Sequence, residues 1–209
     1  MLRKLAAGLA LALVAATAQA AAPPTKSWDW KIKDFKFRSG ESLPELNVHY
    51  YTIGEPKRDA KGQITNAVLL LHGTGGSGLQ FHARQFSDEL FKAGGLLDPA
   101  TTYVIMPDGI GHGRSSKPSD GLRRKFPQYD YADMVEVQHR LVTEKLGVSK
   151  LRLILGTSMG CMHAFMWAEQ WPDAAQALMP LACLPGEIAG RNRLWRKMAI
   201  DAVTSDPAW

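Results

Sequence analysis

A glycine-x-serine-x-glycine pentapeptide at residues 156–160 constrains this chain more than any other feature of its sequence. The apolar run 151–155 before it predicts a buried strand, and residues 161–168 after it have the spacing of a helix. A nucleophile elbow has this order of a strand, the pentapeptide and a helix, and its sharp turn lifts a serine clear of the sheet. Side chains at its two glycine positions would collide with neighbouring backbone. The pattern predicts that Ser158 is a nucleophile; the alternative is a plain glycine-rich turn.

A second glycine-rich loop, residues 72–78, follows the short apolar run 67–71, which is typical of a buried parallel strand. Loops at the carboxyl ends of such strands carry the sites of open α/β sheets. The loop lacks the spacing of phosphate-binding motifs. We therefore expect the backbone N–H groups of Thr74, and of Met159 at the helix start, to form an oxyanion hole. His72 is expected to hold the loop by hydrogen bonding and not to be the base.

Strands that alternate with helices predict a three-layer α/β fold around a mostly parallel sheet. The strand at 46–53 alternates apolar and polar side chains, and His49 falls on its polar face. We therefore expect His49 to be a half-exposed surface residue rather than a catalyst. The other elements are expected as strands at 32–38, 102–106 and 177–183, and as helices at 85–93, 131–146 and 186–203.

The composition excludes some classes of function. The chain of 209 residues is 45% hydrophobic and 22% charged, which is typical of a folded domain. Its formal net charge is +5, but no dense basic run with interleaved aromatic residues occurs, so nucleic-acid binding is not predicted. The two cysteines, Cys161 and Cys183, either pair in an exported protein or are two buried thiols. No spacing suggests a metal site, and no cofactor is expected.

The first twenty residues have the pattern of a secretory signal. Arg3 and Lys4 form a charged start, residues 5–14 an apolar middle, and residues 18–20 a cleavage site of small side chains. We expect cleavage after Ala20 and a periplasmic or secreted protein. The alternative is an uncleaved anchor, but the apolar run is marginal for a membrane span and rich in alanine. We therefore expect no stable membrane anchor.

Several motifs, taken in order, resemble the α/β-hydrolase superfamily. They are His72-Gly73 after the third strand, residues 108–115, and the elbow at Ser158. Within the superfamily the chain is most similar to the homoserine O-acetyltransferase group, from about residue 32 to the C-terminus. The closer match is carried by Phe126-Pro127, Asp133-Met134-Val135, Gln138, Met162, Ala164, Trp167-Ala168, Trp171-Pro172-Asp173, Asn192, Arg196, Ala199-Ile200 and Asp206-Pro207.

The resemblance implies roles for four residues. Ser158 would accept an acyl group, and the N–H groups of Thr74 and Met159 would bind the oxyanion. Arg196 matches an arginine that meets a substrate carboxylate, a role suited to guanidinium; the alternative is a charge on a lid surface. The substrate would be a small ester or acyl compound.

The resemblance also shows where the chain departs from the family. In this superfamily the triad acid and base follow the nucleophile. After Ser158 the only histidine is His163, which lies on the elbow helix and is expected to point away from the place of a base. His112, in the turn after the strand 102–106, has no acid partner at an obvious spacing. We therefore expect residues 21–209 to be an incomplete domain that lacks the last strands and most of the lid, with residues 186–209 as the lid's start.

Three functions remain open from the sequence. The first is an exported serine acyl hydrolase of the esterase kind. The second is an acyltransferase like the homoserine O-acetyltransferases; the export signal weighs against it, because acyl-CoA is a cytoplasmic donor. The third is a fragment without the triad acid and base, and we expect this product to be weakly active or inactive.

Overall fold

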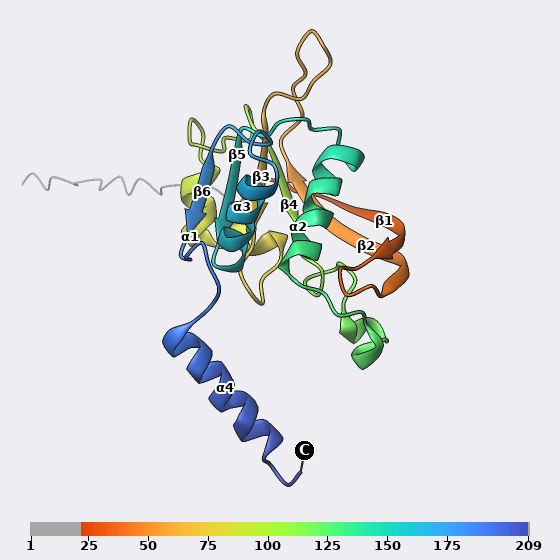
Figure 1. The fold of residues 1–209 in the computed structure, drawn as a ribbon. Helices are drawn as coiled ribbons and strands as arrows, with labels where there is room; N and C mark the ends of the chain where they lie inside the picture. The colour runs from red at the N-terminus through yellow and green to blue at the C-terminus, as the bar shows by residue number, and fades with distance from the viewer. Residues whose placement is uncertain (1–21, 209) are drawn as a thin grey trace, which may run out of the picture.

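The computed structural model describes residues 22–208 of the chain. The expected export signal, with its cleavage point after Ala20, lies outside the described residues. Within them, six strands form one sheet in the order β1-β2-β4-β3-β5-β6 (Figure 1). The strands are β1 (Lys26–Lys36), β2 (Ser42–Ile53), β3 (Ala67–Leu71), β4 (Tyr103–Pro107), β5 (Leu153–Thr157) and β6 (Leu178–Leu181). The helices are α1 (Arg84–Leu90), α2 (Tyr131–Arg140), α3 (Met159–Gln170) and α4 (Gly190–Thr204), with short helical turns η1 (Gly78–His82), η2 (Pro118–Asp120), η3 (Arg123–Lys125) and η4 (Leu141–Lys145).

The sheet is mostly parallel, as predicted. β1 and β2 form an antiparallel hairpin at one edge, and β2 is also antiparallel to β4. The other neighbours, β4 with β3, β3 with β5, and β5 with β6, are parallel. Parallel strands end at the same edge of a sheet, so the loops that follow β3, β4 and β5 meet there.

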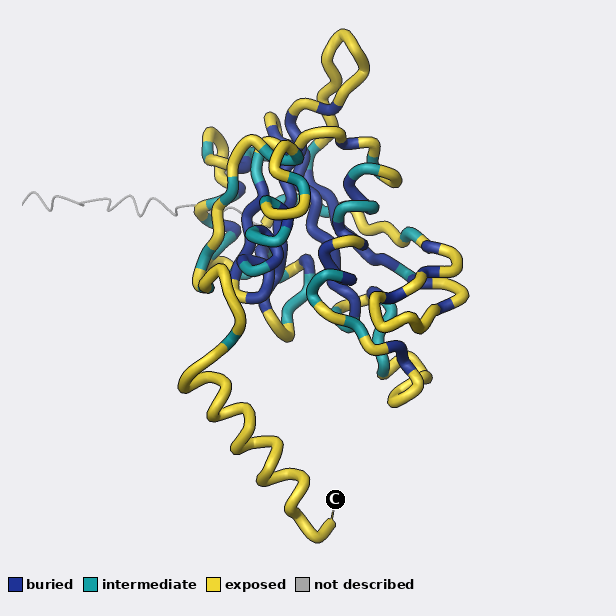
Figure 2. Tube along the Cα trace, viewed as in Figure 1, coloured by how far each residue is buried: buried dark blue, intermediate teal, exposed yellow. Residues whose placement is uncertain are grey.

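Helices cover both faces of the sheet. β3 is buried over its whole length because both of its faces are covered. Leu69 and Leu71 pack in a hydrophobic cluster with residues of α2 and α3, whereas Val68 and Leu70 pack in a second cluster with residues in and beside α1. Figure 1 shows α2 and α3 in front of the sheet, and Figure 2 shows that buried residues concentrate in the central strands. The three-layer α/β prediction is confirmed.

Several element boundaries differ from the sequence-based expectation, and two of these differences have a structural reason. The first strand begins at Lys26 rather than at residue 32, because Lys26 pairs with Thr52 and the hairpin ladder continues from there. The predicted helix at 131–146 is α2 followed by the π-helical turn η4. Gly147 ends this helical stretch with a φ of +65°, a conformation that glycine adopts without a steric penalty.

The expected exposure of His49 is wrong. Its side chain is 0% exposed. Because side chains alternate along β2, His49 and Leu46 point to opposite faces of the strand, and Leu46 faces the core. The loop after β4 covers the other face, on which His49 lies. The His49 N–H donates to Ser115 Oγ at 2.9 Å, and the His49 ring packs edge-on against Tyr51 with 4.7 Å between ring centroids. A long-range loop, which strand alternation cannot reveal, therefore buries this histidine.

α4 carries apolar side chains that remain in solvent. Leu194, Trp195, Met198 and Ile200 are each more than half exposed. Figures 1 and 2 show that α4 extends away from the sheet and its covering helices. The segment that we interpreted as the start of a lid therefore adds one helix outside the three layers.

Candidate active site

Ser158 lies at the junction of β5 and α3 in a strained conformation. Its φ of +52° and ψ of −111° are sparsely populated for a residue with a side chain. A Cβ at Gly156 would lie 2.7 Å from Cys161 N, and one at Gly160 would lie 2.8 Å from His72 O. Closer contacts still would form with the carbonyl groups of Gly160 and Leu71, respectively. The two glycines therefore permit this sharp turn, and the elbow geometry predicted from the pentapeptide is present.

The turn presents the Ser158 side chain to solvent. The Ser158 N–H donates to Leu181 O at 2.9 Å, which fixes the turn against β6. The side chain is exposed and lines a cavity of about 280 Å³. Thr74 and Met159 line the same cavity, so the structure brings the three predicted residues together. Neither the Thr74 N–H nor the Met159 N–H donates to another described residue, which leaves both free for an oxyanion.

Gln80 holds the loop after β3 against the elbow. The Gly73 N–H donates to Gln80 Oε1 at 2.9 Å, and Gln80 Nε2 donates to Thr157 Oγ1 at 2.7 Å. One amide thereby connects the residue before Thr74 to the residue before Ser158. The sequence analysis missed Gln80, because nothing in its local sequence distinguishes it from any surface glutamine.

His72 has the structural role expected of it. Its Nδ1–H donates to Gly73 O at 2.8 Å, while Nε2 accepts from the Gly109 N–H at 2.9 Å. A ring nitrogen that accepts a backbone N–H carries no proton, so the ring is neutral. Burial lowers the pKa of His72, which favours the same state. His72 therefore joins the loops after β3 and β4.

Asp108 makes a second connection between these loops. Its carboxylate accepts the Gly78 N–H at 2.7 Å and the Arg114 N–H at 2.8 Å, and the side chain is buried. A buried carboxylate that accepts two backbone N–H groups fixes both loops. The aspartate therefore anchors both loops, and these two carboxylate contacts are with backbone N–H groups rather than with a histidine.

No histidine among the described residues is bonded to Ser158. All six histidines of the chain lie in this range, and none makes a hydrogen bond to the Ser158 hydroxyl. His112 Nδ1 bonds Ile110 O at 3.0 Å, and its ring has no carboxylate partner within residues 22–208.

His163 points into the protein, away from Ser158, as expected. Its Nδ1 accepts from Gln138 Nε2 at 3.1 Å, and Gln138 Oε1 accepts from Trp167 Nε1 at 3.1 Å. Its Nε2 has no hydrogen-bond partner in the described part of the chain. Burial lowers the pKa of His163 to about 3, so the ring stays neutral and is a very weak base.

Arg196 reaches the Ser158 cavity from α4. It lines the cavity together with Asn192, and its Nε donates to Asn192 Oδ1 at 2.7 Å. This contact orients one edge of the guanidinium and leaves the other nitrogens available. The position is compatible with the predicted contact to a substrate carboxylate.

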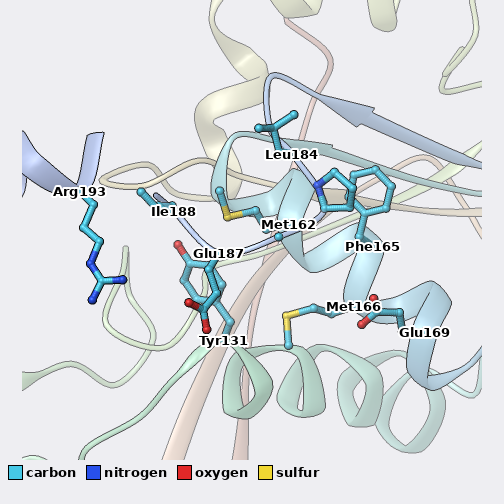
Figure 3. A pocket seen from close by; sticks show the side chains of 11 residues that line it. Tyr131, Met162, Phe165, Met166, Glu169, Leu184, Glu187, Ile188 and Arg193 are labelled. Atoms are coloured by element: carbon cyan, nitrogen blue, oxygen red, sulfur yellow. The ribbon is translucent and has the colours of Figure 1, made fainter. Parts of the chain in front are cut away.

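An apolar hollow of about 580 Å³ adjoins the Ser158 cavity (Figure 3). The two spaces share Met162 and Leu184, which lie on α3 and in the segment after β6. Figure 3 shows Phe165 and Met166 on α3 beside them, with Arg193 at the far end. Such a wall can hold an aliphatic group of a ligand whose reacting carbon sits at Ser158.

A disulfide ties this wall to the elbow helix. Cys161 on α3 and Cys183 after β6 are bonded, with 5.9 Å between their Cα atoms. The structure thus decides the alternative that the sequence left open in favour of pairing. The bond lies between the residues that follow Ser158 and the segment that carries Leu184, so it fixes one side of both cavities.

Neither a metal cluster nor a membrane span is found in residues 22–208. No group of three or more histidine, cysteine, aspartate or glutamate side chains there could hold a metal ion. Among these residues no helix is both long and apolar enough to cross a bilayer.

Comparison with known proteins decides the family. The alpha/beta hydrolase fold family matches residues 66–209, a stretch that contains both glycine-rich loops and the elbow. The chain belongs to the α/β-hydrolase family. A probable acyltransferase of Methanothermobacter thermautotrophicus is 39% identical over 73% of this chain and 46% of its own length. A homoserine O-acetyltransferase of Haloferax prahovense is 34% identical over 85% of this chain and 45% of its own length.

Solved structures of other α/β-hydrolases have the same fold. The acetyl esterase MekB matches with a TM-score of 0.72 and 26% identity, over 90% of this chain and 52% of its own. A homoserine O-acetyltransferase from Staphylococcus aureus matches with a TM-score of 0.70 and 19% identity, over 88% of this chain and 54% of its own. The chain spans about half the length of the relatives that it matches. Esterases and acyltransferases are thus both among its relatives.

Proposed function

We propose that the protein is an exported serine acyl hydrolase that acts through an acyl-enzyme on Ser158. The observation that carries the proposal is the strained serine at a strand-to-helix turn, with two free N–H groups at the same cavity. Strain of this kind is retained where a function requires it. The proposal concerns the whole protein, because no histidine in residues 22–208 is bonded to the Ser158 hydroxyl.

The proposed reaction has two steps. Ser158 Oγ attacks the carbonyl carbon of an ester while a base takes its proton. The Thr74 and Met159 N–H groups stabilise the oxyanion, and the alcohol leaves with the proton as the acyl-serine forms. Water then attacks the acyl-serine and releases the acid. The oxyanion donors alone contribute about 10²- to 10³-fold each to such reactions.

Acyl transfer is the second candidate, and the relatives favour it. Two of them are named homoserine O-acetyltransferase and probable acyltransferase, at 34% and 39% identity. In this reaction an alcohol takes the place of water in the second step. Arg196, which lines the Ser158 cavity, would bind the carboxylate of that alcohol.

Export favours hydrolysis, and two features support export. Residues 1–20 have the pattern of a cleavable signal. The Cys161–Cys183 disulfide is typical of proteins in an oxidising compartment such as the periplasm. Acyl-CoA is a cytoplasmic donor, so an exported enzyme would release its acyl group to water. We propose a periplasmic or secreted location on these grounds.

The experiment compares both reactions in protein purified from its own source. Hydrolysis of nitrophenyl acetate and acetyl transfer from acetyl-CoA to homoserine are measured for the natural protein, for Ser158→Ala and for Ser39→Ala. Ser39 is an exposed serine in the β1–β2 turn, far along the chain from the elbow, and serves as the matched control. We expect hydrolysis that Ser158→Ala lowers by about 10⁴-fold or more and Ser39→Ala leaves unchanged. Faster transfer than hydrolysis would favour the second candidate, and equal rates in both variants would exclude Ser158 as the nucleophile.

A further inference from the structure

His49, the buried histidine of the β1–β2 hairpin, makes a hydrogen bond at each of its two ring nitrogens. Asp29 lies directly opposite His49 in the antiparallel register. His49 Nδ1 is 2.9 Å from Asp29 Oδ1, and His49 Nε2 is 3.2 Å from Ser27 Oγ. A serine, a histidine and a carboxylate are thus connected in the order that activates a nucleophile, at a place unrelated to the elbow.

The side chains next to Ser27, His49 and Asp29 fix the direction of these hydrogen bonds. The pKa of Asp29 is lowered, first by the hydrogen bond from Asn47 Nδ2 at 2.9 Å and then by His49, so Asp29 is a carboxylate that only accepts. His49 Nδ1 must therefore carry a proton, and in the neutral ring Nε2 is an acceptor. Ser27 then donates its hydroxyl proton to Nε2, which is the arrangement of a serine and its general base.

The guanidinium of Arg114 lies beside Ser27. Arg114 Nη1 donates to Ser27 Oγ at 3.4 Å. A guanidinium in this position stabilises negative charge on the serine oxygen and on an oxyanion that forms next to it. Arg114 makes no ion pair with a carboxylate among residues 22–208, so its charge is available.

The backbone around these side chains is held in place. The Asp108 N–H donates to His49 O at 2.8 Å, and the Asp108 carboxylate accepts the Arg114 N–H at 2.8 Å. Asn47 Nδ2 donates to Arg114 O at 3.2 Å as well as to Asp29. The two strands and the loop that supply the four side chains are thus cross-linked, which provides the preorganisation that catalysis needs.

We propose that Ser27, His49 and Asp29 form a second nucleophilic site, with Arg114 as its oxyanion donor, that acts on small activated carboxylic esters. Ser27 Oγ forms a bond to the ester carbonyl carbon, and its proton passes to His49 Nε2. The carbon–oxygen bond to the leaving group breaks, and the leaving group departs with the proton or as a stable anion. Water then hydrolyses the acyl-serine. Ser27 is exposed on the hairpin, which limits the substrates to small esters with good leaving groups.

The test uses the full chain in a Ser158→Ala background, so that the elbow contributes nothing. The probe is nitrophenyl acetate, and both the release of nitrophenol and the site of acetylation are measured. Trypsin should release Ser27 in the short peptide 27–31, because lysines precede and end it. We expect slow hydrolysis and an acetyl group on the serine of this peptide.

Two further variants separate catalysis from structure. Adding Ser27→Ala removes the nucleophile that His49 activates and should lower the rate at least about 100-fold, whereas adding Ser39→Ala should change nothing. Asp29→Asn keeps the size of this exposed side chain and should lower the rate about tenfold or more, with unchanged circular dichroism. No acetylation of peptide 27–31, or equal rates with and without Ser27, would overturn the proposal. Neither result bears on Ser158, which is absent from every variant.

Discussion

Gly160→Ala tests whether the elbow is as tightly packed as the structure shows. The new Cβ would lie 2.8 Å from His72 O and closer still to the carbonyl group of Leu71, the last residue of β3. Both contacts are with backbone at the centre of the sheet, where no side chain can rotate away. α3 must therefore shift from β3 by an appreciable fraction of an ångström or more, which separates Met159 from its place beside Ser158.

The expected cost follows from two opposing effects. Overpacking against rigid backbone costs about 3 kcal/mol, the upper part of the usual range. Alanine gains about 1 kcal/mol over glycine in a helix, which offsets part of it. We therefore expect the free energy of unfolding to fall by about 2 kcal/mol, or the melting temperature by roughly 4–8 °C for a chain of this size.

Calorimetry or urea unfolding measures this change, with Gly186→Ala as the matched control. A Cβ at Gly186 meets nothing within 4 Å, so that variant should differ from the natural protein by less than about 0.5 kcal/mol. A Gly160→Ala protein as stable as the natural one, or more stable through helix propensity alone, would refute the packing argument.

Three more predictions concern the groups around the elbow. Reducing the Cys161–Cys183 bond, which joins residues 22 apart, should lower the free energy of unfolding by about 3 kcal/mol; an unchanged urea midpoint with a dithiol would contradict this. Burial lowers the pKa of His163 from 6.5 to about 3. Between these pH values the unfolded chain therefore binds a proton that the folded chain does not. The free energy of unfolding should fall by about 1.4 kcal/mol per pH unit as the pH drops below 6.5. His163→Gln should flatten that slope in urea titrations at several pH values, and an equally steep slope would show that other groups cause it. Gln80→Ala should cost about 2 kcal/mol by removing two hydrogen bonds, whereas the exposed Gln63→Ala should leave the unfolding midpoint unchanged.

The central features of the fold could be predicted because their signals are local. The buried strand β3 is a continuous apolar run, and the elbow combines such a run, a pentapeptide and a helix within a short stretch. The steric need for glycine at position 156 is likewise local, because a Cβ there would meet Gly160 and Cys161. These features depend on neighbours in sequence, which a sequence pattern can represent. Gly160 is needed for another reason, since a Cβ there would meet Leu71 and His72 at the end of β3.

The missed features depend on contacts between distant segments. His49 was expected in solvent because β2 alternates, but Ser115 from the loop after β4 lies against it. Gln80 has no local signal, and its role exists only because Gly73 and Thr157 come together in space. The pairing of Cys161 with Cys183 likewise required knowledge of where β6 lies next to α3.

The most direct test of the central claim is to identify the serine that becomes acylated in the intact protein from its own source. The protein is treated with a fluorophosphonate, a general label for activated serines, and digested with trypsin. We predict that Ser158, in the peptide 153–191, is the main site of modification, and that Ser158→Ala removes this label and leaves at most slow labelling of Ser27. Equal labelling of the Ser158→Ala protein, or no label in peptide 153–191, would contradict the claim that the elbow serine is the nucleophile.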